Sequence, residues 1–284
     1  MKIDGVLHSK DQGVLSNAVF SYYNNKRMDR NLVQSQSDGY VHHHFGITGT
    51  QIPANASQDQ ITDELQRQET AQTNYLIDLL DLPMQQELRV YDVGCGRGGT
   101  MFRVLERYPQ SHLTGINLTE YQTAFCQEQI AKRGLQDRAK VVQGSYMDAV
   151  FGDAAFTHAV VNEVTPYAYD LDHFFANLAR VLVPGGKVAL ATWAFNDEKD
   201  TSQYWRFLVP ICEHYASMMH GHTAYRAAML KHFRITLEVN KNPELVAYWE
   251  LRKEWKMQSG IEQFFLDAHR NDDLRYLFFV IEKR

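Results

Sequence analysis

An acidic residue followed by closely spaced glycines is the first feature of this sequence that indicates chemistry. The segment Val90-Tyr-Asp-Val-Gly-Cys-Gly-Arg-Gly-Gly-Thr100 places Asp92 two residues before the first of the glycines at 94, 96, 98 and 99. Closely spaced glycines let the backbone approach a ligand. The Asp92 carboxylate would lie badly beside a pyrophosphate and well beside a cation. The spacing therefore favours a positively charged cofactor over a dinucleotide, and an ordinary glycine turn is the remaining alternative.

Two later segments would complete such a site. Asn117 ends a second predicted strand, where an acidic residue commonly accepts hydrogen bonds from ribose hydroxyls, and its amide can take that role. The segment Gly144-Ser-Tyr-Met-Asp148 follows a third predicted strand and would frame an adenine. The candidate cofactor-binding residues are Asp92, Gly94, Cys95, Gly96, Gly98, Asn117, Leu118, Ser145, Tyr146, Met147 and Asn162.

Three consecutive histidines lie in the segment Tyr40-Val-His-His-His-Phe-Gly-Ile47. A metal site is a weak interpretation, because neighbouring side chains of an extended segment point to opposite faces. No cysteine or carboxylate stands nearby at ligand spacing. A plain polar loop is one alternative. We favour a third interpretation, in which these residues, with Arg30 and Asn31 upstream, donate hydrogen bonds to an anionic group such as a diphosphate.

Strands and helices alternate from residue 88 onward, which predicts an α/β fold with a parallel sheet covered by helices on both faces. Ligands of such sheets bind beyond the carboxyl ends of the strands. We expect strands at 88–93, 112–117, 140–143, 155–161, 187–192, 234–239 and 274–282. We expect helices at 62–80, 100–108, 119–132 (capped by Thr119), 171–182, 244–257 and 260–270, loop over most of 1–60, and a helical insertion over the sheet edge at 196–233.

Composition narrows the classes of protein. The chain has 284 residues, of which 44% are apolar, so a large core is expected. The net charge is 29 − 34 = −5 without a long basic cluster, which argues against a nucleic-acid partner. Three widely spaced cysteines fit neither a disulfide framework nor a zinc site, so we expect a reducing, cytoplasmic location. No signal peptide or membrane-spanning run is expected.

The chain resembles the geranyl diphosphate C-methyltransferases, which use S-adenosylmethionine as the methyl donor. The glycine loop and Pro184-Gly-Gly186 are motifs of methyltransferases in general, whereas other motifs are more specific to this family. The more specific ones are Asn31-Leu with Asp38-Gly-Tyr-Val-His-His-His-Phe-Gly-Ile47, Val161-Asn-Glu163, Ile211-Cys-Glu-His-Tyr215 with His220, Tyr248-Trp-Glu-Leu-Arg252 with Gly260-Ile-Glu262, and Arg275-Tyr-Leu with Val280. The resemblance implies a Rossmann-like, seven-stranded class I methyltransferase sheet.

The resemblance also implies roles for single residues. Glu163 matches the family's catalytic base, and Tyr215 matches an aromatic residue, commonly phenylalanine, that steadies a carbocation. Alternatively, Glu163 is a solvated or capping residue, and Arg252 belongs to a plain helix with internal ion pairs. The candidate substrate-binding residues are Asn31, Tyr40, His43, His44, Tyr167, Trp193, Phe195, His220 and Arg252. No side-chain metal site is expected, and Mg²⁺ would be held by the diphosphate and water.

The expected organisation is an amino-terminal arm and helix that caps the substrate (1–82), and a methyltransferase domain (83–284) with the insertion at 196–233. Related enzymes are oligomeric, so we expect a homo-oligomer that acts on a small isoprenoid and binds neither nucleic acid nor membrane. The segment 33–38 departs from the family, which weakens the choice of geranyl diphosphate itself. Alternatives are a C-methyltransferase of a terpenoid without diphosphate, an O- or N-methyltransferase with His214 or His220 as base, and a non-catalytic S-adenosylmethionine- or NAD-binding module.

Overall fold

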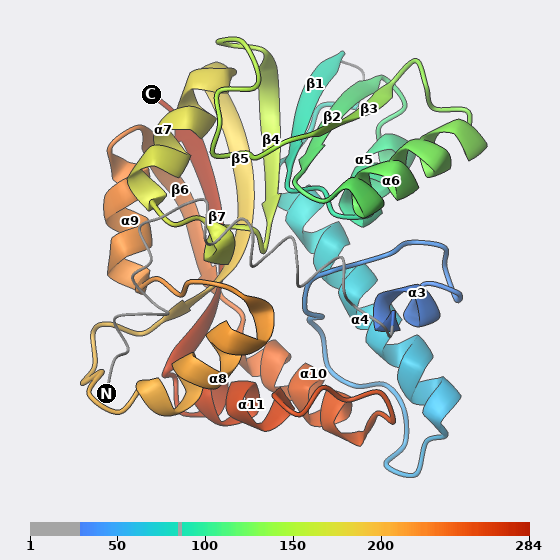
Figure 1. Ribbon diagram of the computed structural model, residues 1–284, viewed down its shortest axis with the longest axis vertical. Coiled ribbons are helices and arrows are strands. Elements are labelled where there is room, and N and C mark those ends of the chain that lie inside the picture. Colours follow the sequence, from blue (N-terminus) through green and yellow to red (C-terminus); the bar gives the residue numbers. More distant parts are fainter. Residues whose placement is uncertain (1–28, 85–86) are drawn as a thin grey trace.

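Seven strands form one sheet in the order β3-β2-β1-β4-β5-β7-β6 in the computed structural model, which describes residues 29–84 and 87–284 (Figure 1). Strands β1 to β5 are parallel, and β7 is antiparallel to both β5 and β6. The order in which strands are added therefore reverses between β1 and β4. The carboxyl ends of these two strands flank the switch point at which ligands bind. The strands are β1 (Leu88–Val93), β2 (Ser111–Asn117), β3 (Ala139–Gln143), β4 (Phe156–Asn162), β5 (Leu182–Phe195), β6 (Phe233–Asn240) and β7 (Leu274–Lys283).

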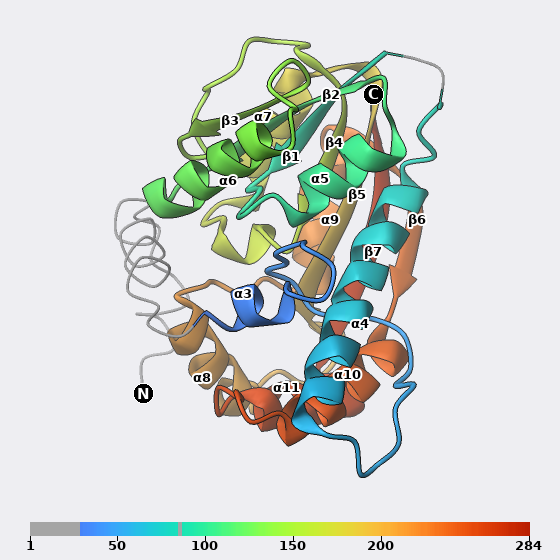
Figure 2. The same cartoon turned by 90° about the vertical axis from the view of Figure 1, so that its right-hand side faces the viewer.

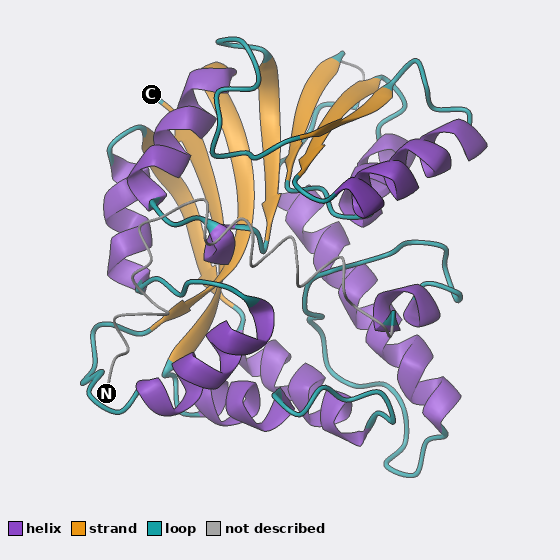
Figure 3. Cartoon of the chain, in the orientation of Figure 1, coloured by secondary structure: helices purple, strands orange, loops and turns teal. Residues whose placement is uncertain are grey.

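Helices cover both faces of this sheet and its carboxyl edge (Figure 3). One apolar core joins the sheet to α4, α5, α6, α10 and α11, and a second joins the opposite face to α7 and α9. None of the helices in the described part of the chain is long and apolar enough to cross a bilayer. The helices are α3 (Arg30–Gln34), α4 (Gln58–Leu79), α5 (Gly99–Arg107), α6 (Glu120–Lys132), η1 (Thr165–Tyr167), α7 (Leu171–Val181), α8 (Trp205–Tyr215), α9 (His222–Leu230), α10 (Asn242–Glu254) and α11 (Glu262–Arg270).

The strand–helix alternation and the seven-stranded sheet are confirmed, with three differences. The short helix α3 lies in a region that we expected to be loop. Helix α4 begins earlier than predicted because Ser57 and Gln60 form a reciprocal capping box. Strand β5 runs through the Pro184-Gly-Gly186 turn signal, and a register shift against β4 takes up the irregularity. Thr119 is the N-cap residue of α6, although its hydroxyl bonds the Gln122 side chain instead of the backbone.

The last strand departs from the purely parallel order because its preceding helices lie beyond the carboxyl edge. Figures 1 and 2 show α10 and α11 gathered there with α8, so the chain enters β7 from that edge. Helix α4 also passes beside α10, and α3 lies against α4. The carboxyl ends of the strands are thus enclosed by α3, α4, α8, α10 and α11, which come from both ends of the described chain.

Candidate active site

The glycine loop connects β1 to α5 in a conformation that requires glycine. Gly94, Gly96 and Gly98 have φ values of 69°, 53° and 83°, and Gly98 is the N-cap residue of α5. A Cβ atom on Gly98 would lie 2.7 Å from the Phe102 ring. The loop therefore presents bare backbone at a helix N-terminus, which is an arrangement suited to close contact with a ligand.

Asp92 lies at the base of this loop with one oxygen unsatisfied. Its side chain is buried, and Oδ2 has no hydrogen-bond partner among the described residues. Burial raises the pKa of Asp92 to about 7. A buried carboxylate without a partner is costly, and a nearby cation would stabilise its charged form. The Asp92 carboxylate therefore fits a positively charged cofactor, as the sequence predicts.

The other predicted cofactor residues lie along the same edge, after β2, β3 and β4. The Asn117 amide nitrogen donates to Thr119 Oγ1 and Gln122 Oε1 (3.2 and 2.9 Å), and its oxygen, which accepts from the Leu118 N–H (3.1 Å), has a second lone pair for a ligand. Residues Ser145, Tyr146 and Met147 follow β3, and Asn162 ends β4. Asn162 pairs with the Gln72 side chain of α4. It therefore links that helix to the carboxyl edge of β1 to β4, which we call the cofactor edge.

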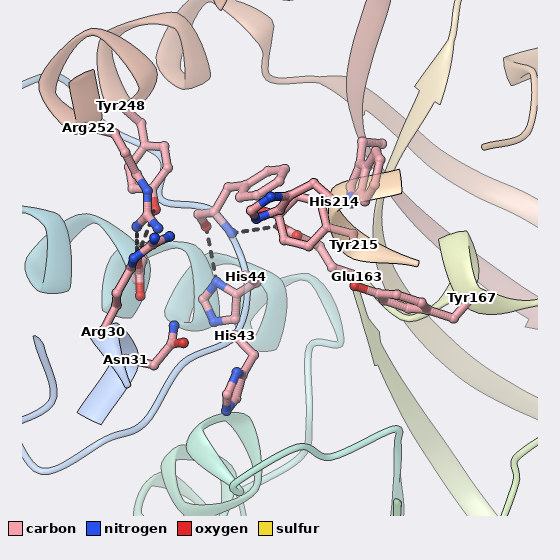
Figure 4. A pocket seen from close by; sticks show the side chains of 13 residues that line it. Arg30, Asn31, His43, His44, Glu163, Tyr167, His214, Tyr215, Tyr248 and Arg252 are labelled. Carbon is pink, nitrogen blue, oxygen red and sulfur yellow. Dashed lines mark hydrogen bonds and ion pairs between the residues drawn. The ribbon is translucent and has the colours of Figure 1, made fainter. Parts of the chain in front are cut away.

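A pocket opens beside this edge and is lined from five helices and three loops or strand ends (Figure 4). Figure 4 shows two ends: Arg30 and Arg252 lie at one, Glu163 and Tyr215 at the other, and His44 between them. Eight predicted site residues meet in this pocket. The lining residues are Arg30, Asn31, His43, His44, Phe45, Glu69, Glu163, Tyr167, Trp193, His214, Tyr215, Tyr248 and Arg252.

Glu163 follows β4 directly and is held in a strained backbone conformation. Its φ of 56° is a left-handed value that costs about 1–3 kcal/mol for such a residue. Carboxylate Oε1 accepts hydrogen bonds from the Phe45 backbone N–H (2.8 Å) and the Tyr276 hydroxyl (2.5 Å). Burial raises the pKa of Glu163 to about 8 despite these bonds. A strained, buried carboxyl with a displaced pKa is typical of a catalytic acid or base.

Arg30, Arg252 and the Glu69 carboxyl group lie at the opposite end of the pocket. The Arg252 guanidinium lies 3.8 Å from Glu69 Oε1 and 4.0 Å from Glu262 Oε1. Burial alone would lower the pKa of Arg252, but Tyr248 and the two carboxylates raise it, so the side chain stays charged. Glu69 Oε2 has no hydrogen-bond partner among the described residues, and burial raises the Glu69 pKa to about 7. This end can bind an anion or, through Glu69, a cation that accompanies an anion.

Known proteins resemble the chain over nearly its whole length. A family model described as a methyltransferase domain matches residues 91–190. A geranyl diphosphate 2-C-methyltransferase of Saccharopolyspora erythraea is 32% identical over 276 residues, which cover 95% of this chain and 95% of that protein. The chain belongs to the geranyl diphosphate C-methyltransferase family. It is therefore an S-adenosylmethionine-dependent methyltransferase.

Solved structures of the family have the same fold. The geranyl diphosphate C-methyltransferase of Streptomyces coelicolor, in complex with Mg²⁺, geranyl-S-thiolodiphosphate and S-adenosyl-L-homocysteine, superposes with a TM-score of 0.89 at 27% identity, covering 95% of this chain and 98% of that one. A geranyl diphosphate methyltransferase bound to geranyl diphosphate and sinefungin gives the same TM-score over 95% of this chain and all of that one. The resemblance inferred from sequence is thus confirmed for family, fold and methyl donor.

The three histidines of this family member divide between two environments. His42 and His44 face the same way and contact each other, with His42 Nδ1 3.2 Å from His44 Nε2. His43 faces the glycine loop, where a Cβ atom on Gly96 would lie 3.2 Å from its ring. No group of three metal-ligating side chains occurs among residues 29–84 and 87–284. His43 and His44 line the pocket, whereas His42 is buried behind it beside Thr70 and Thr73.

Three predicted substrate residues do not line this pocket. Tyr40 donates its hydroxyl to Glu106 Oε2 (2.7 Å), and its ring lies beside two arginines of α5 and the α6 C-cap. Phe195 is at the far end of β5 and packs against Tyr204. His220 lies 2.7 Å from the Ala168 carbonyl at a surface groove between α7 and α9. Tyr40 and His220 each belong to a motif that also supplies a pocket residue, and Phe195 shares strand β5 with the pocket residue Trp193.

Several pocket residues escaped the sequence argument. Glu69 and Tyr248 come from α4 and α10 and bond each other through the Tyr248 hydroxyl (2.8 Å). Phe45 contributes its backbone N–H to Glu163, which a side-chain pattern does not reveal. Tyr276, which bonds Glu163 but does not line the pocket, was also missed, because it lies in an apolar strand within a family motif to which no role was assigned. Polar residues on the inner face of α4 were the available signal.

Proposed function

We propose that this chain methylates an alkene carbon of an isoprenyl diphosphate such as geranyl diphosphate. The observation that carries the proposal is the division of the pocket: Glu163 and Tyr215 at the end near the cofactor edge, and Arg30 and Arg252 at the other. A substrate in which an alkene lies a few bonds from a diphosphate fits that order. The relatives named above bind geranyl diphosphate or its thiolo analogue, which supports the assignment.

The reaction needs a base but no activated nucleophile. When bound, S-adenosylmethionine supplies an electrophilic methyl group on a positively charged sulfur. The alkene π electrons form the new C–C bond as the S–CH₃ bond breaks, which leaves a tertiary carbocation in the substrate. The Glu163 carboxylate stabilises that cation by its charge and then removes a proton from a neighbouring carbon, restoring an alkene. The Tyr215 ring, which contacts Trp193 (centroids 6.0 Å apart), supplies a π face for the cation.

The diphosphate would lie between Arg30, Asn31 and Arg252. A guanidinium binds phosphate oxygens bidentately, and burial strengthens the interaction. Mg²⁺ would be held mainly by phosphate oxygens and water, with the free oxygen of Glu69 as one added ligand. Arg252 already faces two carboxylates, so bound diphosphate would compete with them for it. We therefore expect diphosphate affinity to depend on Mg²⁺.

A substrate panel tests the proposal directly. Purified protein with S-adenosylmethionine is given geranyl diphosphate, geranyl monophosphate and geraniol, with and without Mg²⁺, and products are read by a 14-Da mass gain. We expect methylation of the diphosphate with Mg²⁺ and little with geraniol. Equal turnover of geraniol without Mg²⁺ would favour a terpenoid substrate that lacks diphosphate. Glu163→Gln should keep cofactor affinity and lose about 10²–10⁴-fold in kcat; near-normal turnover would remove Glu163 from the reaction.

We further propose a domain organisation, a cellular location and an oligomeric state for this enzyme. The segment 29–82 supplies α3, the histidines and α4, so an arm up to residue 82 that caps the substrate fits the geometry, although residues 1–28 lie outside the described part of the chain. The three cysteines are free and buried, in keeping with a reducing, cytoplasmic location. A homo-oligomer rests on the family resemblance, and sedimentation at micromolar concentration tests it.

A further inference from the structure

A line of buried polar side chains stands behind Glu163 and does not line the pocket. The Tyr276 hydroxyl of β7 donates to Glu163 Oε1 at 2.5 Å. The Gln72 amide nitrogen of α4 donates to that same hydroxyl oxygen at 3.0 Å and to Asn162 Oδ1 at 2.8 Å. Asn162 in turn donates to Thr100 Oγ1 on α5, beside the glycine loop (3.2 Å). The line therefore connects the base to the cofactor edge.

The two members nearest to Glu163 are fixed in place. Tyr276 is fully buried, and its backbone N–H donates to the buried Asn242 side chain at 2.8 Å. Its ring contacts Phe45 and Phe278, with centroids 6.0 and 5.1 Å apart. Gln72 is also fully buried. A hydrogen bond from Gln72 polarises the Tyr276 O–H, which strengthens the bond that Tyr276 donates.

This arrangement distinguishes the two carboxylate oxygens of Glu163. Oε1 already receives the Tyr276 hydroxyl and the Phe45 N–H, so Oε2 is the oxygen with capacity to take a proton. We propose that Tyr276 and Gln72 are positioning residues that hold the Glu163 carboxylate in one orientation and thereby select which proton the carbocation loses. The inference rests on the proposed function and deepens it.

Selection matters because the cation has several protons to lose. After methyl transfer, the cationic carbon is flanked by the newly methylated carbon, by a chain methylene and by a methyl group. Loss of a proton from each carbon gives a different alkene, and addition of water with loss of a proton gives a tertiary alcohol. A carboxylate held by two hydrogen bonds reaches one of these protons, whereas a rotating one reaches several.

The same hydrogen bond affects the pH dependence of the reaction. A donor to the ionised form lowers the carboxyl pKa, so loss of the Tyr276 hydroxyl should raise the pKa of Glu163 further. The other groups around Glu163 in the pocket are Glu69 on α4, Tyr167 on η1, His214 and Tyr215 on α8, Trp193 on β5, and His44 and the Phe45 N–H. All of them remain in a Tyr276→Phe variant, so a shift would report the lost hydroxyl.

The test compares product mixtures and pH profiles of the full chain with S-adenosylmethionine, Mg²⁺ and geranyl diphosphate. Tyr276→Phe should lower kcat about 10–100-fold and move the acidic limb of kcat/KM to higher pH by about one unit. Products are dephosphorylated and resolved by gas chromatography with mass detection. We expect new alkene isomers or the alcohol, which wild-type protein does not form. Gln72→Met should give the same products to a smaller extent.

Tyr204→Phe is the matched control. Tyr204 is likewise buried and donates its hydroxyl to a backbone carbonyl, that of Asn196 (3.0 Å), away from Glu163. Its product mixture and pH profile should equal those of the wild type. A single product and an unmoved pH limb in both Tyr276→Phe and Gln72→Met would overturn the inference, even at reduced turnover. Failure of the wild type to methylate the diphosphate would instead overturn the proposed function.

Discussion

Gly46, directly after the histidines, is the position where a single methyl group should disturb both stability and catalysis. A Cβ atom there would lie 2.6 Å from Gln68 Cβ, 2.7 Å from Tyr248 Cδ2 and 2.9 Å from the Gln68 carbonyl carbon. Carbon atoms at van der Waals contact are about 3.5–4.0 Å apart. In Gly46→Ala, the segment therefore has to move away from α4 by about 1 Å.

That movement would loosen contacts on both sides of Gly46. Ile47 N–H donates to the Gln68 carbonyl (3.2 Å), and Phe45 N–H donates to Glu163 (2.8 Å). Overpacking of this kind costs about 1–3 kcal/mol, which corresponds to a fall of roughly 2–5 °C in Tm for a chain of this length. Displacement of a base by about 1 Å can cost about 10²-fold in turnover. We therefore expect Gly46→Ala to lower both Tm and kcat.

Gly49→Ala provides the control, because nothing lies within 4 Å of a Cβ atom at Gly49. It should change the free energy of unfolding by no more than about 0.5 kcal/mol and leave kcat unchanged. Tm is measured by calorimetry and kcat by methyl transfer. If Gly46→Ala matched Gly49→Ala in both, the segment would not be seated on α4 as described. A lower Tm with unchanged kcat would show that the Phe45 N–H is dispensable for Glu163.

Two further variants test the glycine loop and a buried histidine. Gly98→Ala and Gly134→Ala both strain a positive φ, but only Gly98 has an atom within 4 Å of the added Cβ. Calorimetric titration should therefore show at least a ten-fold loss of S-adenosylmethionine affinity for Gly98→Ala alone. Equal affinities of the two variants would contradict the loop geometry. Burial lowers the pKa of His44 from 6.5 to about 4, so the unfolded chain binds the proton first and stability is lost as pH falls through that window. The free energy of unfolding of the wild type, measured with urea, should therefore exceed that of His44→Gln by about 1 kcal/mol less at pH 5 than at pH 6. A constant difference would mean that His44 is not buried and neutral.

Local patterns predicted the parts of the fold that depend on local interactions. The apolar run before Asp92 and the glycines after it predicted a strand, a tight turn and a helix, because each requirement lies within a few residues. The helix α3 was missed because its N-cap interaction, in which Asp29 accepts from the Leu32 N–H (3.1 Å), supports only a five-residue helix. Such a helix leaves no periodic signal.

The candidate site could be predicted only where one segment supplies it. Glu163 and Tyr215 came from motifs, whereas Gln72 and Tyr276 are 204 positions apart and meet only in the folded chain. The sequence did carry a signal for Gln72, one residue of this pair. Leu65, Glu69, Gln72 and Leu76 lie at spacings of 4, 3 and 4 on α4, so all four share one buried face. Polar residues at buried positions of a helix need buried partners, and this indicates a site.

The strain at Glu163 shows why those partners come from both ends of the chain. Its left-handed φ costs about 1–3 kcal/mol, and each hydrogen bond to an ionised group contributes about 1.5–3 kcal/mol. One such bond comes from Phe45 and the other from Tyr276, so the amino-terminal segment and β7 together offset the strain. The Phe45 segment that lines the pocket therefore helps to hold Glu163 in its orientation. The proposed base is thus oriented in part by Phe45, which also lines the pocket proposed to hold the substrate.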